Sequence, residues 1–564
     1  MRYFIPEWDD RVDPDYDFIT DTHSNSHKLD PIKHDSYMWD LFGIENVPFD
    51  GVLVSIATIQ NKSKKYSLIE QCGIHKFLGL PSDFPIMADC GAFSYVTETV
   101  PPYSTSNVLK IYSDLGFNAG VSIDHLVVTG YAKQKNERMQ ITYQNGLDAY
   151  EEWKKKYHND FQLIVSIQGS ESKDYINMYN KFVRKGITSL ALGGLVRSPT
   201  SEIIHIIDNL IQEIKKSKKR PEYLHFFGIA RPQLFYKLSE LEDLGINIAF
   251  DSASHLRRAW LASPETQGNY ITQDGQGYTA IRIPYKLSRK KKDLANQEDV
   301  EKYGSICLEK LRKYDKEQID IQDVINELDN FNRLIGGKPP YIDFYQNLLK
   351  DKPWKSCPCP ICKNIGIEVA IFRGNNRNRR RGFHNTLSFY NILKNKDLWD
   401  KRCLSKEITS LENFKPEGKV LAITGCTKNK LEIPEESKVA AKDLYQGTLF
   451  KKVRAFCEIN HYDYRIISAK YGLLRPEDKI QNYDKMLKTK NDILNIKTSV
   501  ESELNQIIDD YDVILVIAGI NYRKVLSNLI DERFTILKSK GIGDLVHIVS
   551  VAISPKNKVL DEYF

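Results

Sequence analysis

At residues 246–252 the chain reads Ile-Asn-Ile-Ala-Phe-Asp-Ser, a short apolar run that is typical of a buried strand and ends in a carboxylate. Similar runs recur through the first 285 residues at intervals of about 25 to 45 residues, and helix-compatible sequence follows each of them. The other expected strands are residues 52–59, 85–93, 119–126, 163–169, 190–194, 223–230 and 278–285. Seven strand–helix units and the eighth strand at 278–285 predict an α/β fold of the TIM (β/α)8 barrel type, with an open doubly wound sheet as the alternative.

The composition is that of a soluble globular protein, because 41% of the 564 residues are apolar and 27% are charged. Disordered and fibrous classes are therefore excluded, and the length suggests roughly three to four domains. The formal net charge of +6 is too small to indicate a polyanionic partner by itself. No apolar run approaches the length of a membrane span, and residues 1–10 lack a signal core, so we expect a cytoplasmic protein without membrane contact.

Changes in composition along the chain predict four parts. We expect the barrel at residues 1–350, a subdomain with clustered cysteines at 351–405, a polar linker at 406–418 and a three-layer α/β domain at 419–564. The barrel part includes a Lys-rich stretch at 286–292, interpreted as a solvated loop, and a helical stretch at 300–348. In the last part, strands are expected at residues 420–424, 464–468, 512–518 and 545–553.

A metal site is indicated by Cys357, Cys359 and Cys362, which His384 follows after 21 intervening residues. The chain has only nine cysteines, too few for a disulfide scaffold, so the cluster favours a metal in a reducing compartment. Three thiolates and one imidazole complete a tetrahedral set without an open position. We therefore expect one structural zinc ion per chain in a zinc-binding subdomain at residues 351–405.

Carboxylates stand at the ends of three expected strands. Asp89, Asp124 and Asp251 each follow apolar residues, where a charge is costly to bury unless it is hydrogen-bonded or functional. Because barrel strands present their carboxyl ends at one mouth, we expect the three side chains to converge there. Two further strands end in Gln168-Gly169 and Gly193-Gly194, where glutamine can bind a base edge and glycine lets a flat ligand approach the backbone.

These residues resemble, in chain order, the motifs of the tRNA-guanine transglycosylase superfamily. Residues 89–93, Asp-Cys-Gly-Ala-Phe, are similar to its Asp-Ser-Gly-Gly-Phe motif, and Asp124 matches its second base-reading aspartate. The glycine-containing strand ends resemble its Gln-Gly-Gly and Gly-Gly-Leu elements, and Phe227-Gly228 resembles its Met-Gly platform. Phe250-Asp251 corresponds to its Phe-Asp pair, and the cysteine and histidine spacing resembles its zinc site.

The resemblance implies a pentosyltransferase in which Asp251 attacks C1′ of a guanine nucleotide and Asp89 handles protons. It also implies that Phe93 stacks on the purine and that Phe227 and Gly228 lie beneath it. The incoming base would be held by Asp124, Gln168 and the backbone of Gly193 and Gly194. Two displacements at C1′ then give net retention of configuration.

Departures from the enzymes that act on tRNA point to a DNA substrate. The nucleophile is followed by Ser-Ala-Ser-His-Leu-Arg-Arg at residues 252–258, where the tRNA enzymes have a Pro-Thr-Arg element. This segment and the opening Phe4-Ile5-Pro6-Glu7-Trp8 look more like the DpdA branch, which puts 7-deazaguanines into DNA. The implied partners are DNA, a free 7-deazaguanine base such as 7-cyano-7-deazaguanine, and helper proteins that modify the base or open the duplex. The alternatives are the same chemistry on tRNA and a non-catalytic nucleic-acid-binding homologue.

Arginines follow the nucleophile and fill the segment between the last cysteine and His384. The predicted nucleic-acid contacts are Arg257, Arg258, Arg373, Arg377, Arg379, Arg380 and Arg381. We expect their guanidinium groups to bind phosphates without reading the base sequence.

The C-terminal part has three motifs of its own, Gly-Cys-Thr-Lys at 425–428, Asp-Leu-Tyr-Gln-Gly at 443–447 and Ser-Ala-Lys-Tyr-Gly-Leu-Leu at 468–474. It resembles the uncharacterised family DUF6884 and, more distantly, the YaaA family. Lys428 and Lys470 at two adjacent strand ends predict a phosphate or nucleic-acid site. Catalysis by Cys426 and a purely structural role are the alternatives.

Overall fold

The computed structural model describes residues 1–60, 63–217, 219–261, 268–287, 295–337, 341–412, 414–434 and 436–554. The chain forms two compact units, Met1–Trp399 and Asp400–Phe564, each with its own hydrophobic core. Most of the Lys-rich stretch predicted as a solvated loop lies outside the described residues. Among the residues that are described, none of the helices is both long and apolar enough to span a bilayer.

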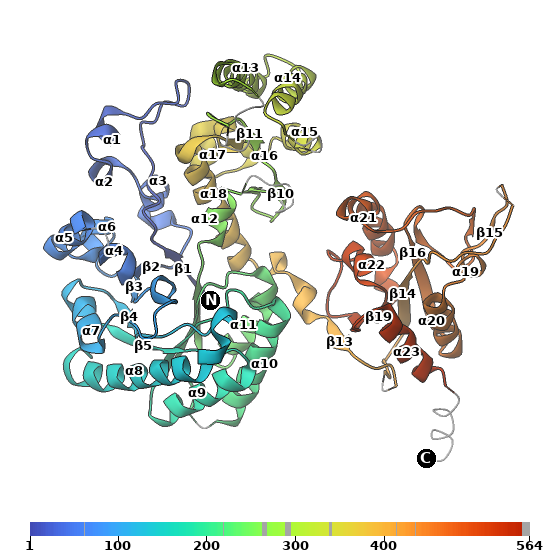
Figure 1. Ribbon diagram of the computed structural model, residues 1–564, viewed down its shortest axis with the longest axis horizontal. Helices are drawn as coiled ribbons and strands as arrows, with labels where there is room; N and C mark the ends of the chain where they lie inside the picture. The colour runs from blue at the N-terminus through green and yellow to red at the C-terminus, as the bar shows by residue number, and fades with distance from the viewer. Residues whose placement is uncertain are drawn as a thin grey trace. The chain divides into compact units, whose positions relative to one another are not determined.

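The first unit contains a closed barrel of eight parallel strands, which confirms the predicted TIM fold and excludes the open sheet (Figure 1). The strands are β1 (Arg2–Pro6), β2 (Gly51–Ser55), β3 (Ile86–Asp89), β4 (Ala119–Val121), β5 (Gln162–Ile167), β6 (Ser189–Leu192), β7 (Tyr223–Phe226) and β8 (Asn247–Asp251). Each strand contributes one side chain to a buried layer inside the barrel, composed of Phe4, Leu53, Met87, Val121, Ile164, Ala191, Tyr223 and Ala249. This packed layer closes the barrel below the carboxyl ends of its strands.

The strand expected at residues 278–285 is wrong. This segment forms the two short strands β10 (Gly277–Tyr278) and β11 (Ile281–Arg282), which pair outside the barrel with β9 (Tyr270–Ile271) and β12 (Ile371–Phe372). The barrel is closed instead by β1, which pairs in parallel with both β2 and β8. A five-residue run that ends in proline gives a weak local signal, and its membership in the barrel depends on pairing with a strand about 245 residues away.

Helices pack around the barrel with the predicted alternation. The main ones are α5 (Ser63–Cys72), α7 (Thr105–Asp114), α8 (Lys135–Lys156), α9 (Ser172–Arg184), α10 (Thr200–Lys216) and α11 (Phe235–Glu242). In α10 the isoleucines and leucines at 203, 206, 207, 210, 211 and 214 are buried, a spacing of three and four residues that forms one apolar face. Burial of that face against the barrel fixes the position of the helix.

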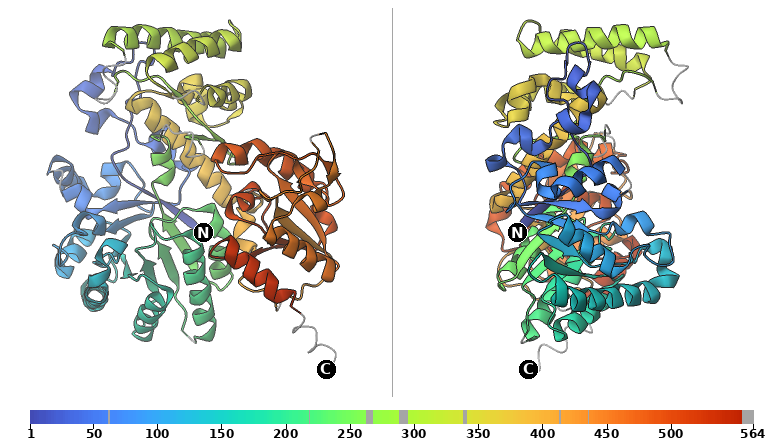
Figure 2. Two further views of the ribbon diagram at one scale, coloured as in Figure 1. Left: turned by 45° about the vertical axis from the view of Figure 1, so that its right-hand side comes forward. Right: turned by 90° about the vertical axis from the view of Figure 1, so that its left-hand side faces the viewer.

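The remainder of the first unit is mostly helical, apart from the short strands β9 to β12, and shares the hydrophobic core of the barrel. It contains α12 (Ser254–Arg258), α13 (Gln297–Asp315), α14 (Ile321–Leu334), α15 (Tyr341–Asp351), α16 (Pro353–Ser356), α17 (Pro360–Ile365) and α18 (Gly374–Lys394), which confirms the expected helical stretch. Both views of Figure 2 place α13 and α14 (yellow-green) at the end of this unit farthest from α8 and α9. The segment with the cysteines therefore packs directly on the barrel rather than forming a core of its own.

The second unit is a six-stranded sheet in the order β13-β20-β19-β14-β16-β17. Its strands are β13 (Lys406–Ile408), β14 (Val420–Gly425), β16 (Asp463–Ser468), β17 (Gly472–Leu474), β19 (Val513–Ile517) and β20 (Phe534–Leu537), and only β17 is antiparallel to its neighbour. In Figure 1, α21 (Lys490–Asn505) and α22 (Ile520–Val525) lie on one face, and α20 (Thr448–Ile459) and α23 (Ile542–Ala552) lie on the other. This is the predicted three-layer domain.

Two predictions for this unit are wrong in detail. Residues 545–553 were expected as a strand because five of them are valine or isoleucine, but they belong to helix α23, whose Leu545 and Val549 face the core four residues apart. The first residues of the predicted linker form β13, which pairs with β20 at the edge of the sheet. Tertiary packing decides both cases, because neither segment has a decisive local pattern.

Candidate active site and metal centre

A cavity of about 840 Å³ opens at the carboxyl ends of the barrel strands. Its lining includes every residue predicted for catalysis or base binding, namely Asp89, Phe93, Asp124, Gln168, Gly193, Gly194, Phe227, Gly228 and Asp251. These residues come from six different strands or the loops that follow them. The closure of the barrel therefore brings together side chains that lie more than 160 residues apart in the sequence.

Asp251, the last residue of β8, is buried and held by two donors on one carboxylate oxygen. The Gly228 N–H donates to Asp251 Oδ1 at 3.1 Å, and Nε2 of His225 lies 3.0 Å from the same atom. His225 is fully buried, and its Nδ1 lies 3.3 Å from the Tyr223 hydroxyl. These contacts orient the carboxylate and leave Oδ2 for other partners.

His225 is a site residue that the sequence analysis missed. The alternation of strand residues was the available signal, because it places residues 223, 225 and 227 on the same side of β7, and Phe227 was predicted to line the site.

Asp89, the last residue of β3, has a different environment. Its Oδ1 is buried without a hydrogen-bond partner among the described residues. Burial raises the pKa of Asp89 to about 7; the Ser55 hydrogen bond lowers it, and the charges of Asp251 and Asp124 add to the increase. Near neutral pH this carboxyl group therefore exists in both the neutral and the ionised form.

Asp124 anchors the polar wall of the cavity. Its Oδ2 accepts hydrogen bonds from the Gln168 amide at 2.5 Å and from the Ser166 hydroxyl at 2.9 Å. Burial raises the pKa of Asp124, while these hydrogen bonds lower it. The Cys90 thiol also donates to Asp124 Oδ1, at 3.6 Å.

Two glycines let the backbone form the cavity wall. A Cβ atom on Gly193 would lie 2.1 Å from the Gln168 amide nitrogen, so any side chain would displace that group. Gly228 has a φ of +71°, which disfavours other residues, and the same conformation presents its N–H to Asp251.

Aromatic and cationic side chains surround the mouth of the cavity. Phe93 and Trp8 are 57% and 44% exposed, although both line the cavity. The Arg257 guanidinium lies 4.7 Å from the centre of the Trp8 ring, which keeps this predicted contact residue at the mouth. Arg258 is half-buried and is not among the residues that line the cavity.

The predicted phosphate-binding role of the arginines in and next to α18 is contradicted for four of five. Arg373, Arg377, Arg380 and Arg381 are at most 8% exposed. Arg377 pairs with Glu368 at 2.7 Å and also with Asp21, and Arg373 pairs with Asp21 at 2.6 Å.

Backbone carbonyls accept hydrogen bonds from the other two buried arginines. Arg381 donates to the carbonyls of residues 259, 369 and 371, and Arg380 donates to the carbonyl of residue 13. Burial lowers the pKa of Arg381 to about 9. Arg380 thereby links α18 to the N-terminal segment, and Arg381 links it to residues 259, 369 and 371. Of the five arginines, only Arg379 is partly exposed.

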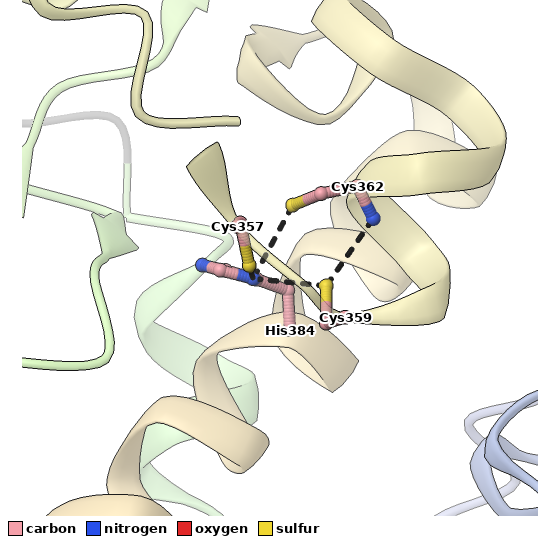
Figure 3. Close-up of side chains that lie close together, drawn as sticks. All are labelled: Cys357, Cys359, Cys362 and His384. Carbon is pink, nitrogen blue, oxygen red and sulfur yellow. Dashed lines mark hydrogen bonds between the residues drawn. The ribbon is translucent and has the colours of Figure 1, made fainter. Parts of the chain in front are cut away.

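The four predicted metal ligands lie together and are buried. His384 Nδ1 is 3.6 Å from the sulfur of Cys357 and 3.4 Å from those of Cys359 and Cys362 (Figure 3). A tetrahedral zinc ion with ordinary Zn–S and Zn–N bonds of about 2.3 and 2.0 Å would place sulfur and nitrogen about 3.5 Å apart. The His384 Nε2–H donates to the carbonyl of Ile271 at 2.8 Å, which leaves Nδ1 free to bind a metal. The donor set therefore fits a metal ion with four protein ligands.

Comparisons with known proteins agree with this geometry. Residues 44–276 match the family described as queuine tRNA-ribosyltransferase, and residues 421–547 match a family of unknown function, DUF6884. A DNA-guanine transglycosylase of Salmonella montevideo is 32% identical over 422 residues, which cover 70% of this chain and 97% of that protein. The uncharacterized protein YfjM of Bacillus subtilis (strain 168) is 26% identical over 149 residues, 25% of this chain and 99% of YfjM.

Fold and site together define a barrel pentosyltransferase. The chain belongs to the guanine transglycosylase family and carries a DUF6884 domain in its C-terminal unit.

Proposed function

We propose that this enzyme replaces guanine in DNA by a 7-deazaguanine base, with 7-cyano-7-deazaguanine as the preferred incoming base. The observation that carries the proposal is the pair of carboxyl groups facing one cavity, where Asp251 accepts two hydrogen bonds and Asp89 has a pKa of about 7. One group is prepared to act as an anion and the other to exchange a proton.

In the first step, an oxygen of Asp251 bonds to C1′ while the bond between C1′ and guanine N9 breaks. The electron pair of that bond leaves with N9, and neutral Asp89 supplies the proton that completes free guanine. His225 and the Gly228 N–H keep the attacking carboxylate oriented, since both bind its other oxygen.

In the second step, N9–H of the incoming base gives its proton to ionised Asp89, and N9 bonds to C1′. The bond between C1′ and Asp251 breaks, which regenerates both carboxyl groups. Two inversions at C1′ give net retention.

Asp124, Gln168 and the Gly193-Gly194 backbone are the proposed contacts to the base edge. A guanine in duplex DNA must leave the base stack to reach this cavity. Trp8, Phe93 and Arg257 at the mouth support this assignment, because exposed rings stack on bases and a guanidinium neutralises phosphates.

The metal that Cys357, Cys359, Cys362 and His384 would hold is zinc, in a structural role. Zinc binding would link α17, α18 and the strand β9, whose Ile271 carbonyl binds His384. None of the four ligands lines the cavity, so the ion would take no part in base exchange.

The test is exchange of radiolabelled guanine into DNA and into unmodified tRNA by the purified enzyme. We expect exchange with DNA, faster for single-stranded or mismatched target regions and decreasing with added salt. Free 7-cyano-7-deazaguanine should compete with labelled guanine and appear in the DNA by nucleoside mass spectrometry. Exchange into tRNA with none into DNA would transfer the proposal to the tRNA alternative, and exchange into neither would support the non-catalytic homologue.

A further inference from the structure

The second unit contains a group of side chains that the proposed exchange reaction does not use. The three motifs that stand out in its sequence meet at the carboxyl ends of the adjacent parallel strands β14 and β16. There they form what we call the lysine–tyrosine cluster, composed of Cys426, Lys430, Tyr445, Ser468, Lys470, Tyr471, Tyr483 and Tyr522.

Hydroxyl groups link the base of the cluster. The Tyr483 hydroxyl lies 2.8 Å from the Tyr445 hydroxyl and 2.8 Å from the Ser468 hydroxyl, and Tyr445 and Ser468 are fully buried. Ser468 Oγ also accepts hydrogen bonds from the backbone N–H groups of Lys470 and Tyr471. This network fixes the orientation of Tyr483, which is itself only half-buried.

A contact between Cys426 and Tyr522 joins the cluster to the helix on the other side of β14. Cys426 directly follows β14, and its sulfur lies 3.1 Å from the Tyr522 hydroxyl. Tyr522 belongs to α22, which follows β19, the neighbour of β14 on the other side. In open α/β sheets, ligands bind outside the carboxyl ends of strands where the strand order reverses, and β14 is at that position here.

The two lysines of the cluster lie over aromatic rings. Lys430 Nζ is 4.3 Å from the centre of the Tyr483 ring, and Lys470 Nζ is 5.0 Å from that of Tyr471 and 5.9 Å from that of Tyr483. Within the part of the chain that the structure describes, no ion pair is formed by either ammonium group. Burial lowers the pKa of Lys430, and the negative charge of Asp484 acts against this shift.

The combination of rings and cations indicates the chemistry of the ligand. Ammonium groups that form no ion pair can bind phosphate, and the ring of a half-buried tyrosine such as Tyr471 can stack on a base. The Tyr471 and Tyr483 rings are 5.4 Å apart and nearly perpendicular, at 86°, so the face of one ring meets the edge of the other beneath the two cations. A nucleotide unit offers both a phosphate and a flat base.

We propose that the second unit binds a nucleotide unit at the lysine–tyrosine cluster, with its phosphate between Lys430 and Lys470 and its base against Tyr471. This site is separate from the barrel cavity and takes no part in breaking the glycosidic bond. Its ligand is either one unit of a single DNA strand or a free nucleotide, which share this chemistry.

The experiment uses the full chain and two probes without guanine. Fluorescence anisotropy measures binding of a labelled 10-mer of thymidine, and isothermal titration calorimetry measures binding of deoxythymidine monophosphate. The test variant is Lys430→Ala/Lys470→Ala, and the matched control is Lys406→Ala/Lys451→Ala, which removes the same charge from exposed positions of the same unit.

We expect at least one probe to bind, and the test variant to weaken that binding about tenfold while the control variant does not. For the 10-mer, losing the one phosphate that both lysines neutralise should also reduce the slope of log affinity against log salt by about 0.7. Tyr471→Leu should weaken the same probe about tenfold through lost stacking. Should the double variant fail to fold, Lys470→Gln serves, because Lys470 is exposed.

Binding of the 10-mer alone assigns the site to a DNA strand, and binding of the mononucleotide assigns it to a free nucleotide. Binding of neither probe, or equal affinities for the test and control variants, overturns the proposal. Guanine exchange at saturating short substrate should be unchanged in the test variant. A failure of this site is thereby distinguished from a failure of the exchange reaction.

Discussion

Three carboxyl groups of the barrel stand at the ends of apolar strand segments in the sequence, but the structure gives each a different chemical environment. Asp251 receives two hydrogen bonds, Asp124 receives two from a serine and a glutamine, and Asp89 leaves one buried oxygen without a partner among the described residues. For Asp89, burial outweighs the hydrogen bond from Ser55 and raises the pKa to about 7. The roles proposed for Asp251 and Asp89 rest on this difference.

Asp251→Asn keeps the size of the side chain and removes the attacking charge. We expect loss of labelled-guanine exchange to background, with affinity for DNA within a factor of about two of the wild type. Exchange assays and anisotropy on the same preparation measure both quantities. Exchange by this variant at the rate of the wild type would exclude Asp251 as the nucleophile.

Asp89 should make guanine release depend on pH. Neutral Asp89 is the proposed acid, so release in a single turnover should fall as pH rises through about 7. Asp89→Asn should be about 10² to 10⁴ times slower and show no such dependence. An unchanged pH profile in the variant would contradict the assignment.

The raised pKa of Asp89 also makes the free energy of unfolding depend on pH. Its pKa is higher in the folded chain than in the unfolded one, about 7 against about 4, so the folded state binds more protons between these values and the free energy of unfolding decreases as pH rises through this range. Asp89→Asn should therefore be more stable than the wild type at pH 8, as measured by urea unfolding.

At the scale of elements, α18 combines a metal ligand with buried ion pairs. Removal of one thiolate by Cys359→Ala should release the metal, lower the melting temperature and reduce soluble yield before it changes the chemical step. Metal analysis by mass spectrometry should find about one zinc ion per wild-type chain and much less in the variant. Well-folded wild-type protein without zinc would remove the metal from the proposal.

The buried arginines of α18 should contribute to stability rather than to DNA affinity. Arg377→Met removes the cation that Asp21 and Glu368 share, although Arg373 and Arg312 still pair with them. Breaking a buried ion pair costs about 3–5 kcal/mol in free energy of unfolding, and we expect the lower value because one cation remains at each carboxylate. Arg257→Ala is the contrasting variant, because its side chain lies at the cavity mouth. Arg257→Ala should weaken DNA binding with little change in stability, and the opposite pattern would restore the original prediction for α18.

At the scale of the whole molecule, the two units have separate hydrophobic cores. A fragment of residues 1–399 should therefore fold, bind zinc and exchange guanine in a short DNA substrate. A fragment of residues 400–564 should unfold in one cooperative transition, as followed by circular dichroism. Loss of exchange by a well-folded first fragment would show that the C-terminal unit is required for the reaction.

The sequence by itself determined the strand–helix rhythm of the barrel, the carboxylates at strand ends and the spacing of Cys357, Cys359, Cys362 and His384. These are local properties, because periodicity and motif spacing act over a few tens of residues. The predicted site residues meet at one cavity since a barrel brings the ends of its strands to one mouth.

Only the tertiary structure decided which strand closes the barrel, that residues 542–552 form a helix, and that His225 supports Asp251. The tertiary structure also shows that four of the arginines predicted to bind phosphates are buried. One of them, Arg377, pairs with Asp21, which lies 356 residues away in the sequence. A run of arginines looks the same in sequence whether it faces water or a carboxylate. Burial and charge pairing depend on contacts between distant segments, and those exist only once the chain has folded.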